Sequence, residues 1–294
     1  MRIADCGLRI AFLLGLGALL CATSPQRVSA QERTIPMAPD GYLRVFNREG
    51  SIRITGWDVD SVHWRAHLSP GQEFFGGGSG RMAKLGATGA DGPATFELQV
   101  PRGAKLVIDA GESTVDVEGM TGPVEIRGAG GAVHLSGAPV RLTIETVDGA
   151  VTLAGGPFRS TEVRTAGGMI RVRGARGEIV LSSVTGAIFA EVDSVTRGGI
   201  TTVAGVIRFG GGLDPTGTLT VESHGGDIQL RLDPRPGLEI VATAFGGTIE
   251  NSLTTATPRP VRDGRSQLLE TTAGGGGGTV TVTSFKGRVR IEPR

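Results

Sequence analysis

The chain has 294 residues and a formal net charge of +1, and its 49 glycines lack the three-residue period of collagen, which excludes that class. Only 4% of the residues are aromatic and 39% are hydrophobic, which predicts a thin aliphatic core rather than a bulky globular centre. Without residues 1–30, which hold three arginines and one aspartate, 27 basic and 28 acidic residues remain, a balance that does not favour nucleic acid or an anionic membrane as a partner.

The N-terminus has the pattern of a secretory signal peptide. Arg2 and Arg9 precede an apolar run over residues 10–22, and the small residues of Val28-Ser29-Ala30 offer a cleavage site. The apolar run is too short to span a bilayer. We therefore predict a signal peptide over residues 1–30 and a mature chain without a transmembrane segment. The protein is expected to be exported, to the periplasm, the cell surface or the medium.

The only two cysteines, Cys6 and Cys21, lie inside this predicted leader. Cleavage would leave a mature protein with no disulfide and no thiol chemistry. Cys21 keeps a lipoprotein alternative open, although Leu20 stands where a small residue is expected. Residues 31–40 follow as a predicted linker.

Residues 41–105 are predicted to form a first rung with capping strands. Apolar and polar residues alternate on both sides of Gly50, which is typical of two strands joined by a turn. Alternation returns at 59–68 and at 95–100, and residues 71–92 between them are rich in glycine. We interpret these segments as two strands capping the N-terminal end, joined by a flexible loop.

Residues 106–253 contain eight copies of one sequence repeat. Each copy has two alternating apolar residues, a turn, and two more alternating apolar residues. The anchor residues of the turns are spaced 18 to 21 residues apart, at Ser113, Gly131, Gly149, Gly168, Gly186, Gly205, Gly226 and Gly247. A fixed period near 20 with strand-type alternation predicts a solenoid of stacked rungs.

Alignment on the anchors gives columns of aliphatic residues. Five residues before the anchor stand Ile108, Ile126, Ile144, Val163, Leu181, Ile200, Val221 and Ala242. Two residues after it stand Val115, Val133, Val151, Ile170, Ile188, Ile207, Ile228 and Ile249. Stacked parallel strands would bring each column into a line with a spacing of about 4.8 Å. One rung cannot bury its own apolar face, but a stack of rungs can.

The C-terminal part begins with residues 254–278, which are rich in proline and glycine and are predicted to be an irregular insertion. Residues 279–294 contain one more copy of this repeat, around Gly287, and are predicted to form a closing rung. The predicted fold class is therefore all-β, a parallel β-solenoid or β-helix of 18–21-residue rungs with capping strands at the N-terminal end.

Four features together resemble a known bacterial family. They are the first repeat at 43–57, the segment at 100–104 that precedes the regular stack, the repeats of the stack, and the glycine run before the closing strand. Over about residues 40–292 the chain resembles the exported β-repeat proteins of the "putative adhesin" domain-of-unknown-function family. This resemblance implies the fold and an adhesin-like role in the cell envelope. It supplies no catalytic residues.

Motifs for catalysis, cofactors and metals are not found. Gly76–Gly80 is followed by Arg81 rather than by the lysine of a phosphate-binding loop. His63 and His67 are four residues apart, but on a strand about 13 Å separates them, too far for one zinc ion. Asp148 and Asp227 are too sporadic for the calcium sites of a repeat protein. We predict no catalytic, cofactor or metal site and therefore no enzyme.

Two outward columns carry charge. Four residues before the anchor, Asp109, Arg127, Glu145 and Arg164 alternate in sign and are expected to form a ladder of ion pairs. Three residues after the anchor, Arg171, Phe189 and Arg208 lie on consecutive rungs. This trio is the candidate partner-binding patch. An intramolecular cation–π stack and a partner-binding role both remain open.

Three classes of function fit these observations. A non-enzymatic exported interaction or structural protein is the leading one, with an envelope protein or a glycan as partner. A carbohydrate-binding module would use the end that holds Trp57 and Trp64. A polysaccharide-cleaving β-helix would need clustered acids and aromatic platforms on one outer face, but Tyr42 and the two tryptophans all lie near the N-terminal end.

Overall fold

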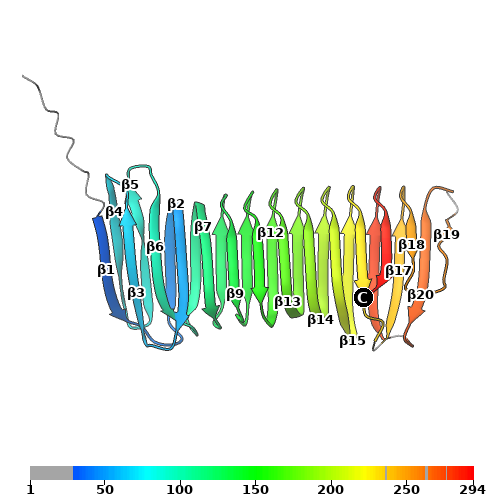
Figure 1. The fold of residues 1–294 in the computed structure, drawn as a ribbon, viewed down its shortest axis with the longest axis horizontal. Coiled ribbons are helices and arrows are strands. Elements are labelled where there is room, and N and C mark those ends of the chain that lie inside the picture. The colour runs from blue at the N-terminus through cyan, green and yellow to red at the C-terminus, as the bar shows by residue number, and fades with distance from the viewer. Residues whose placement is uncertain (1–28, 236, 262–263, 276) are drawn as a thin grey trace, which may run out of the picture.

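The computed structural model describes residues 29–235, 237–261, 264–275 and 277–294, and these contain strands and no helix. The predicted signal peptide lies outside the described residues except for Ser29 and Ala30. The strands are β1 (Ser29–Pro36), β2 (Tyr42–Trp57), β3 (Ser61–Leu68), β4 (Gln72–Ser79), β5 (Met82–Gly89), β6 (Ala94–Pro101), β7 (Lys105–Met120), β8 (Val124–Gly128), β9 (Val133–Gly137), β10 (Leu142–Thr146), β11 (Val151–Gly155), β12 (Phe158–Thr165), β13 (Ile170–Ser183), β14 (Ile188–Thr202), β15 (Ile207–Ser223), β16 (Ile228–Leu232), β17 (Leu238–Ala244), β18 (Ile249–Asn251), β19 (Arg259–Pro260), β20 (Gln267–Ala273), β21 (Gly278–Ser284) and β22 (Val289–Pro293). They lie side by side along the long axis of the molecule (Figure 1).

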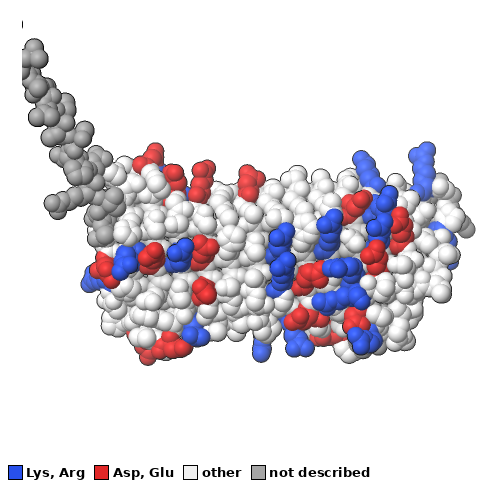
Figure 2. Space-filling view, viewed as in Figure 1, with Lys and Arg blue, Asp and Glu red and all other residues white. Residues whose placement is uncertain are grey.

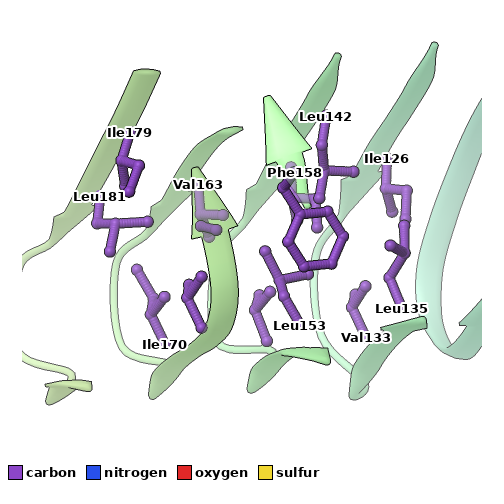
Figure 3. Packing of buried hydrophobic residues seen from close by; sticks show 14 of the residues in the cluster. Ile126, Val133, Leu135, Leu142, Leu153, Phe158, Val163, Ile170, Ile179 and Leu181 are labelled. Carbon is purple, nitrogen blue, oxygen red and sulfur yellow. The ribbon is translucent and has the colours of Figure 1, made fainter. Parts of the chain in front are cut away.

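Equivalent strands of successive repeats pair in parallel, so the all-β class and the predicted register of the columns are confirmed. One line runs through Ile126, Ile144 and Val163 on β8, β10 and β12. A second line runs through Val133, Val151, Ile170 and Ile188 on β9, β11, β13 and β14. The two lines face each other across the interior and are buried (Figure 3). Packing between them forms the thin aliphatic core that the composition indicates.

The N-terminal end differs from the predicted linker and flexible loop. Residues 29–36 form β1, which pairs antiparallel with β3 and buries Ile35. The glycine-rich stretch forms the antiparallel hairpin β4–β5 rather than a flexible loop. Leu85 on β5 of this hairpin is buried, and the Phe74 ring on β4 stacks on Trp64 with 5.9 Å between ring centroids. The glycines conceal the alternation of these strands in the sequence, because they have no side chain to mark a face.

The closing repeat is not the last layer of the stack. β21 pairs in parallel with β15 on one side and with β17 on the other, and β22 lies between β16 and β18 in the same way. The C-terminal segment therefore fills a gap that the chain leaves between two earlier repeats. The chain-order stacking expected from the sequence is wrong at this point.

The predicted irregular insertion also contains regular structure. Within residues 254–278, β20 pairs antiparallel with the outer edge of β17, and the short β19 pairs with β20. Leu269 on β20 lies opposite Ala242 and is buried. This segment covers the C-terminal end of the stack, as β1 and the β4–β5 hairpin cover the other end.

A buried hydroxyl three residues before the anchor closes many of the turns, a feature that the sequence analysis missed. The side-chain oxygens of Thr146, Thr165, Ser183, Thr202 and Ser223 accept hydrogen bonds of 2.8–3.1 Å from the N–H of the anchor glycine. In these turns the anchor glycine has no room for a side chain. A Cβ on Gly168 would lie 2.0 Å from the carbonyl oxygen of Gly149 in the preceding repeat.

Candidate functional site

The predicted ladder of ion pairs forms in two separate pieces. Asp109 pairs with Arg127 at 3.9 Å, and Glu145 pairs with Arg164 at 3.7 Å, each across one strand spacing. Among the described residues no ion pair joins Arg127 to Glu145. Each arginine is also held by a glutamate on its own strand. Figure 2 shows one face of the molecule, on which charged side chains of both signs gather at the N-terminal end and over the C-terminal half, with a largely uncharged stretch between.

The predicted patch of Arg171, Phe189 and Arg208, hereafter the arginine–aromatic patch, is brought together by the register of β13, β14 and β15. The guanidinium carbons of Arg171 and Arg208 lie 5.6 and 5.5 Å from the centroid of the Phe189 ring. One cation therefore lies on each neighbouring strand, with the ring between them. Both arginines are exposed, and Phe189 is half-buried.

A hollow of about 340 Å³ adjoins the arginine–aromatic patch. Its rim carries Phe189, Arg208, Gln229, Glu191 and Arg231, and the last two form an ion pair. The pair spans two strand spacings, because the residue between them on β15 is a glycine. A Cβ on that residue, Gly210, would lie 2.4 Å from the Glu191 carboxylate.

Some arginines near the patch have a carboxylate partner and others do not. Arg231 is held by Glu191, and a hydrogen bond from Arg290 to Glu250 raises the pKa of the Arg290 guanidinium. In the described part of the chain, no carboxylate forms an ion pair with Arg171 or Arg208, or with Arg173 two residues along β13. Glu191 on β14 is the strand neighbour of Arg173 but pairs with Arg231, so the exposed guanidinium groups of Arg171 and Arg208 stay without an ion pair in the described residues.

The N-terminal end does not offer the aromatic platform expected of a carbohydrate-binding module there. Trp64 is only 1% exposed and packs on Phe74 beneath the β4–β5 hairpin. Trp57 is half-buried, and its indole N–H donates a hydrogen bond to the Ser61 carbonyl oxygen. The ring of Tyr42 is half-buried, with the Lys105 ammonium 5.6 Å from its centroid. The prediction of a carbohydrate-binding platform at Trp57 and Trp64 is therefore wrong, because the Trp64 ring belongs to the core.

The other chemical candidates have structural partners. The His63 ring is 2.9 Å from the Thr34 hydroxyl and 3.4 Å from the Glu32 carboxylate. The described residues contain no group of three or more His, Cys, Asp or Glu side chains that would hold a metal ion. A groove of about 620 Å³ over β8 and β10 contains Glu125 and Glu145, and both carboxylates are paired with arginines.

Comparison with known proteins gives a likeness of fold. A crystal structure of a "putative adhesin" from Parabacteroides merdae has a TM-score of 0.51 and 13% sequence identity, and covers 89% of this chain and 95% of that chain. A second "putative adhesin", from Parabacteroides distasonis, has a TM-score of 0.43 and 14% identity over 90% of this chain and 97% of that one. No protein-family model and no curated protein matches the sequence. At this level of identity the first likeness shows the fold alone.

An exposed apolar edge was missed by the sequence analysis. Two residues before the anchor stand Val147, Val184 and Val203, and each is about half exposed (48–52%). The same column continues into a stack of three rings, His224, Phe285 and Phe245, with centroid separations of 5.0 and 5.2 Å. The alignment on the anchors contains this column, but an apolar residue beside a turn does not by itself indicate exposure. No helix in the described residues is long and apolar enough to cross a membrane.

Proposed function

We propose that this chain is an exported parallel β-solenoid that serves as an adhesin-like, non-enzymatic interaction module of the bacterial cell envelope. The stacked parallel repeats support the solenoid, because each strand pairs with its equivalent in the next repeat. The likeness to a structure called a "putative adhesin" supports the role. The leader pattern over residues 1–30 supports export.

The arginine–aromatic patch is the contact surface of this module, and it is the single observation that carries the proposal. Arginine and aromatic residues are enriched at the centres of protein interfaces, where they contribute most of the binding energy. Here Phe189 lies between two exposed arginines that have no described carboxylate partner. The hollow beside them gives a partner a concave surface to enter.

Replacing Phe189 with serine, with Arg171 and Arg208 kept, is expected to remove an envelope partner. Loss of a central aromatic contact typically costs about 2 kcal/mol or more, roughly thirtyfold in affinity. The measurement is capture from an envelope extract of the producing cell, with bound material identified for parent and variant. Phe46→Ser is the matched control, because the Phe46 ring also contacts two cations, with Arg44 and Lys84 at 4.6 and 4.7 Å from its centroid.

Capture of the same partners by the parent and by a folded Phe189→Ser variant would reduce the patch to a structural cation–π stack. An equal loss in the Phe46→Ser control would also contradict the assignment, because the effect would then not depend on position. Release of reducing sugar from envelope polysaccharide by the parent protein would contradict the non-enzymatic role.

A further inference from the structure

Three exposed arginines without a described carboxylate partner lie close together on the face that carries the arginine–aromatic patch. Arg171 and Arg173 point outward from β13, and Arg208 points outward from β15. Most other arginines of the described stack are ion-paired, among them Arg127, Arg164 and Arg231. Guanidinium groups bind carboxylates and sulfates through paired N–H donors, so this face is suited to an anionic ligand.

Phe189 lies between the two arginines along the stack. Arg171 and Arg208 lie two strand spacings from each other, about 10 Å. One small anion cannot contact both, but a polymer with recurring anionic groups can contact both if it lies along the stack axis. The ring restrains both guanidinium groups, which lowers the entropy cost of binding.

The same geometry disfavours two other modes of binding an anionic polymer. Single-stranded nucleic acid binds to proteins by stacking its bases on free aromatic faces, whereas a guanidinium group lies near each side of the Phe189 ring. An extended peptide that binds through its backbone adds a strand to a sheet edge. The patch is on the face of strands that are paired on both sides, so it offers no such edge.

The hollow beside Arg208 supplies polar groups of the kind that sugar hydroxyls need. Glu191 brings a carboxylate to its rim and Gln229 brings an amide, beside the Arg208 guanidinium. The absence of a side chain at Gly210 lets the Glu191 carboxylate reach across β15 to Arg231. Anion-binding and hydroxyl-binding groups thus lie next to each other along one line of the stack.

We propose that the arginine–aromatic patch binds an acidic polysaccharide that runs along the stack axis. Carboxylates or sulfates of the polymer contact Arg171 and Arg208, and a sugar ring lies in the hollow beside Arg208 and Gln229. This proposal rests on the proposed interaction function and names the class of ligand that the site takes.

The test is a binding titration of the mature chain with four polymers at low and at high salt. Polygalacturonate carries carboxylates, dextran sulfate carries sulfates, dextran is neutral, and oligothymidylate is a single-stranded nucleic acid. The parent is expected to bind one or both of the first two, with an affinity that falls as salt rises. The stronger of the two identifies the anionic group.

The double variant Arg171→Gln/Arg208→Gln is expected to lose at least about tenfold in affinity, the change that corresponds to one charged hydrogen bond. The control Arg33→Gln/Arg141→Gln removes the same charge from two exposed arginines, on β1 and just before β10, that also have no described ion-pair partner and lie outside the line of the patch. It is expected to bind within about twofold of the parent, since distant surface charges are screened. Thermal melting of both variants checks that each remains folded.

Three results would overturn the inference: no binding of either acidic polysaccharide at low salt, an equal loss in the two double variants, or preferential binding of oligothymidylate through the patch. Failure here is distinguishable from failure of the proposed function. If the polymers do not bind but Phe189→Ser still removes an envelope partner, the ligand class is wrong and the interaction module stands.

Discussion

Replacing Ile170 with aspartate is expected to unfold the central repeats. Ile170 is 0% exposed and lies in line between Val151 and Ile188. The substitution removes a buried aliphatic contact worth about 1.5–3 kcal/mol and leaves an unpaired buried charge that costs about 3–5 kcal/mol more. A domain is typically stable by only about 5–15 kcal/mol, so most of that stability would be lost.

Circular dichroism of the Ile170→Asp variant, as a spectrum and as a thermal melt, measures this effect. Thr152→Asp is the matched control, because Thr152 lies on the adjacent strand β11 and points to the outer face. The control is expected to melt within a few degrees of the parent, since surface substitutions usually change stability by about 0.5 kcal/mol or less. Strand content and melting unchanged by Ile170→Asp would contradict the buried aliphatic line.

A chain that ends at residue 277 is expected to lose the ordered C-terminal end of the stack. It lacks β21 and β22, which bury Val280, Val282, Val289 and Ile291 between earlier repeats. At about 1.5–3 kcal/mol for each buried side chain, the lost burial amounts to roughly 6–12 kcal/mol. β17, β18 and β20 would also lose their connection through hydrogen bonds to the rest of the stack.

Amide hydrogen exchange of the truncated chain is the measurement. Protection is expected to disappear from β17 and β20 and to persist in β8–β12, which lie several strands away. A peptide of residues 278–294 is expected to restore protection when added, and a scrambled peptide of the same composition is its control. Full protection of β17 and β20 in the truncated chain would contradict the placement of the last repeat.

The sequence predicted the repeat core because a column is a local and periodic signal. Each rung carries the same alternation, so the partners of Ile144 and Ile170 follow once the anchors are aligned. The order of the layers is not contained in that signal. The strand through Val282 has the same pattern as any other rung, and nothing local shows that it inserts between Val221 and Ala242.

The candidate site could also be predicted from the sequence only in part. The register predicted that Arg171, Phe189 and Arg208 would be neighbours, and the geometry of the stack confirms this arrangement. The hollow was not predictable from the repeat, because its rim includes the Glu191–Arg231 ion pair, which crosses β15 where position 210 is a glycine. The two N-terminal capping strands predicted at 59–68 and 95–100 are present as β3 and β6. The outermost strands of the two ends, β1, the β4–β5 hairpin and β20, were missed because they pair antiparallel and fall outside the period.

The order of the stack decides which outward side chains become neighbours, including Gln229 beside the inserted β22 at the border of the hollow. Cysteine cross-linking tests that order most directly, in a chain with Cys6 and Cys21 replaced by serine. Thr220 on β15 and Thr281 on β21 are exposed paired residues one strand apart, about 4.8 Å between Cα atoms, within the range of a disulfide. Val241 on β17 is one strand further, about 10 Å from Thr220. The account predicts that Thr220→Cys/Thr281→Cys forms an intramolecular disulfide and that Thr220→Cys/Val241→Cys does not. A disulfide in the second variant and none in the first would show that the repeats stack in chain order.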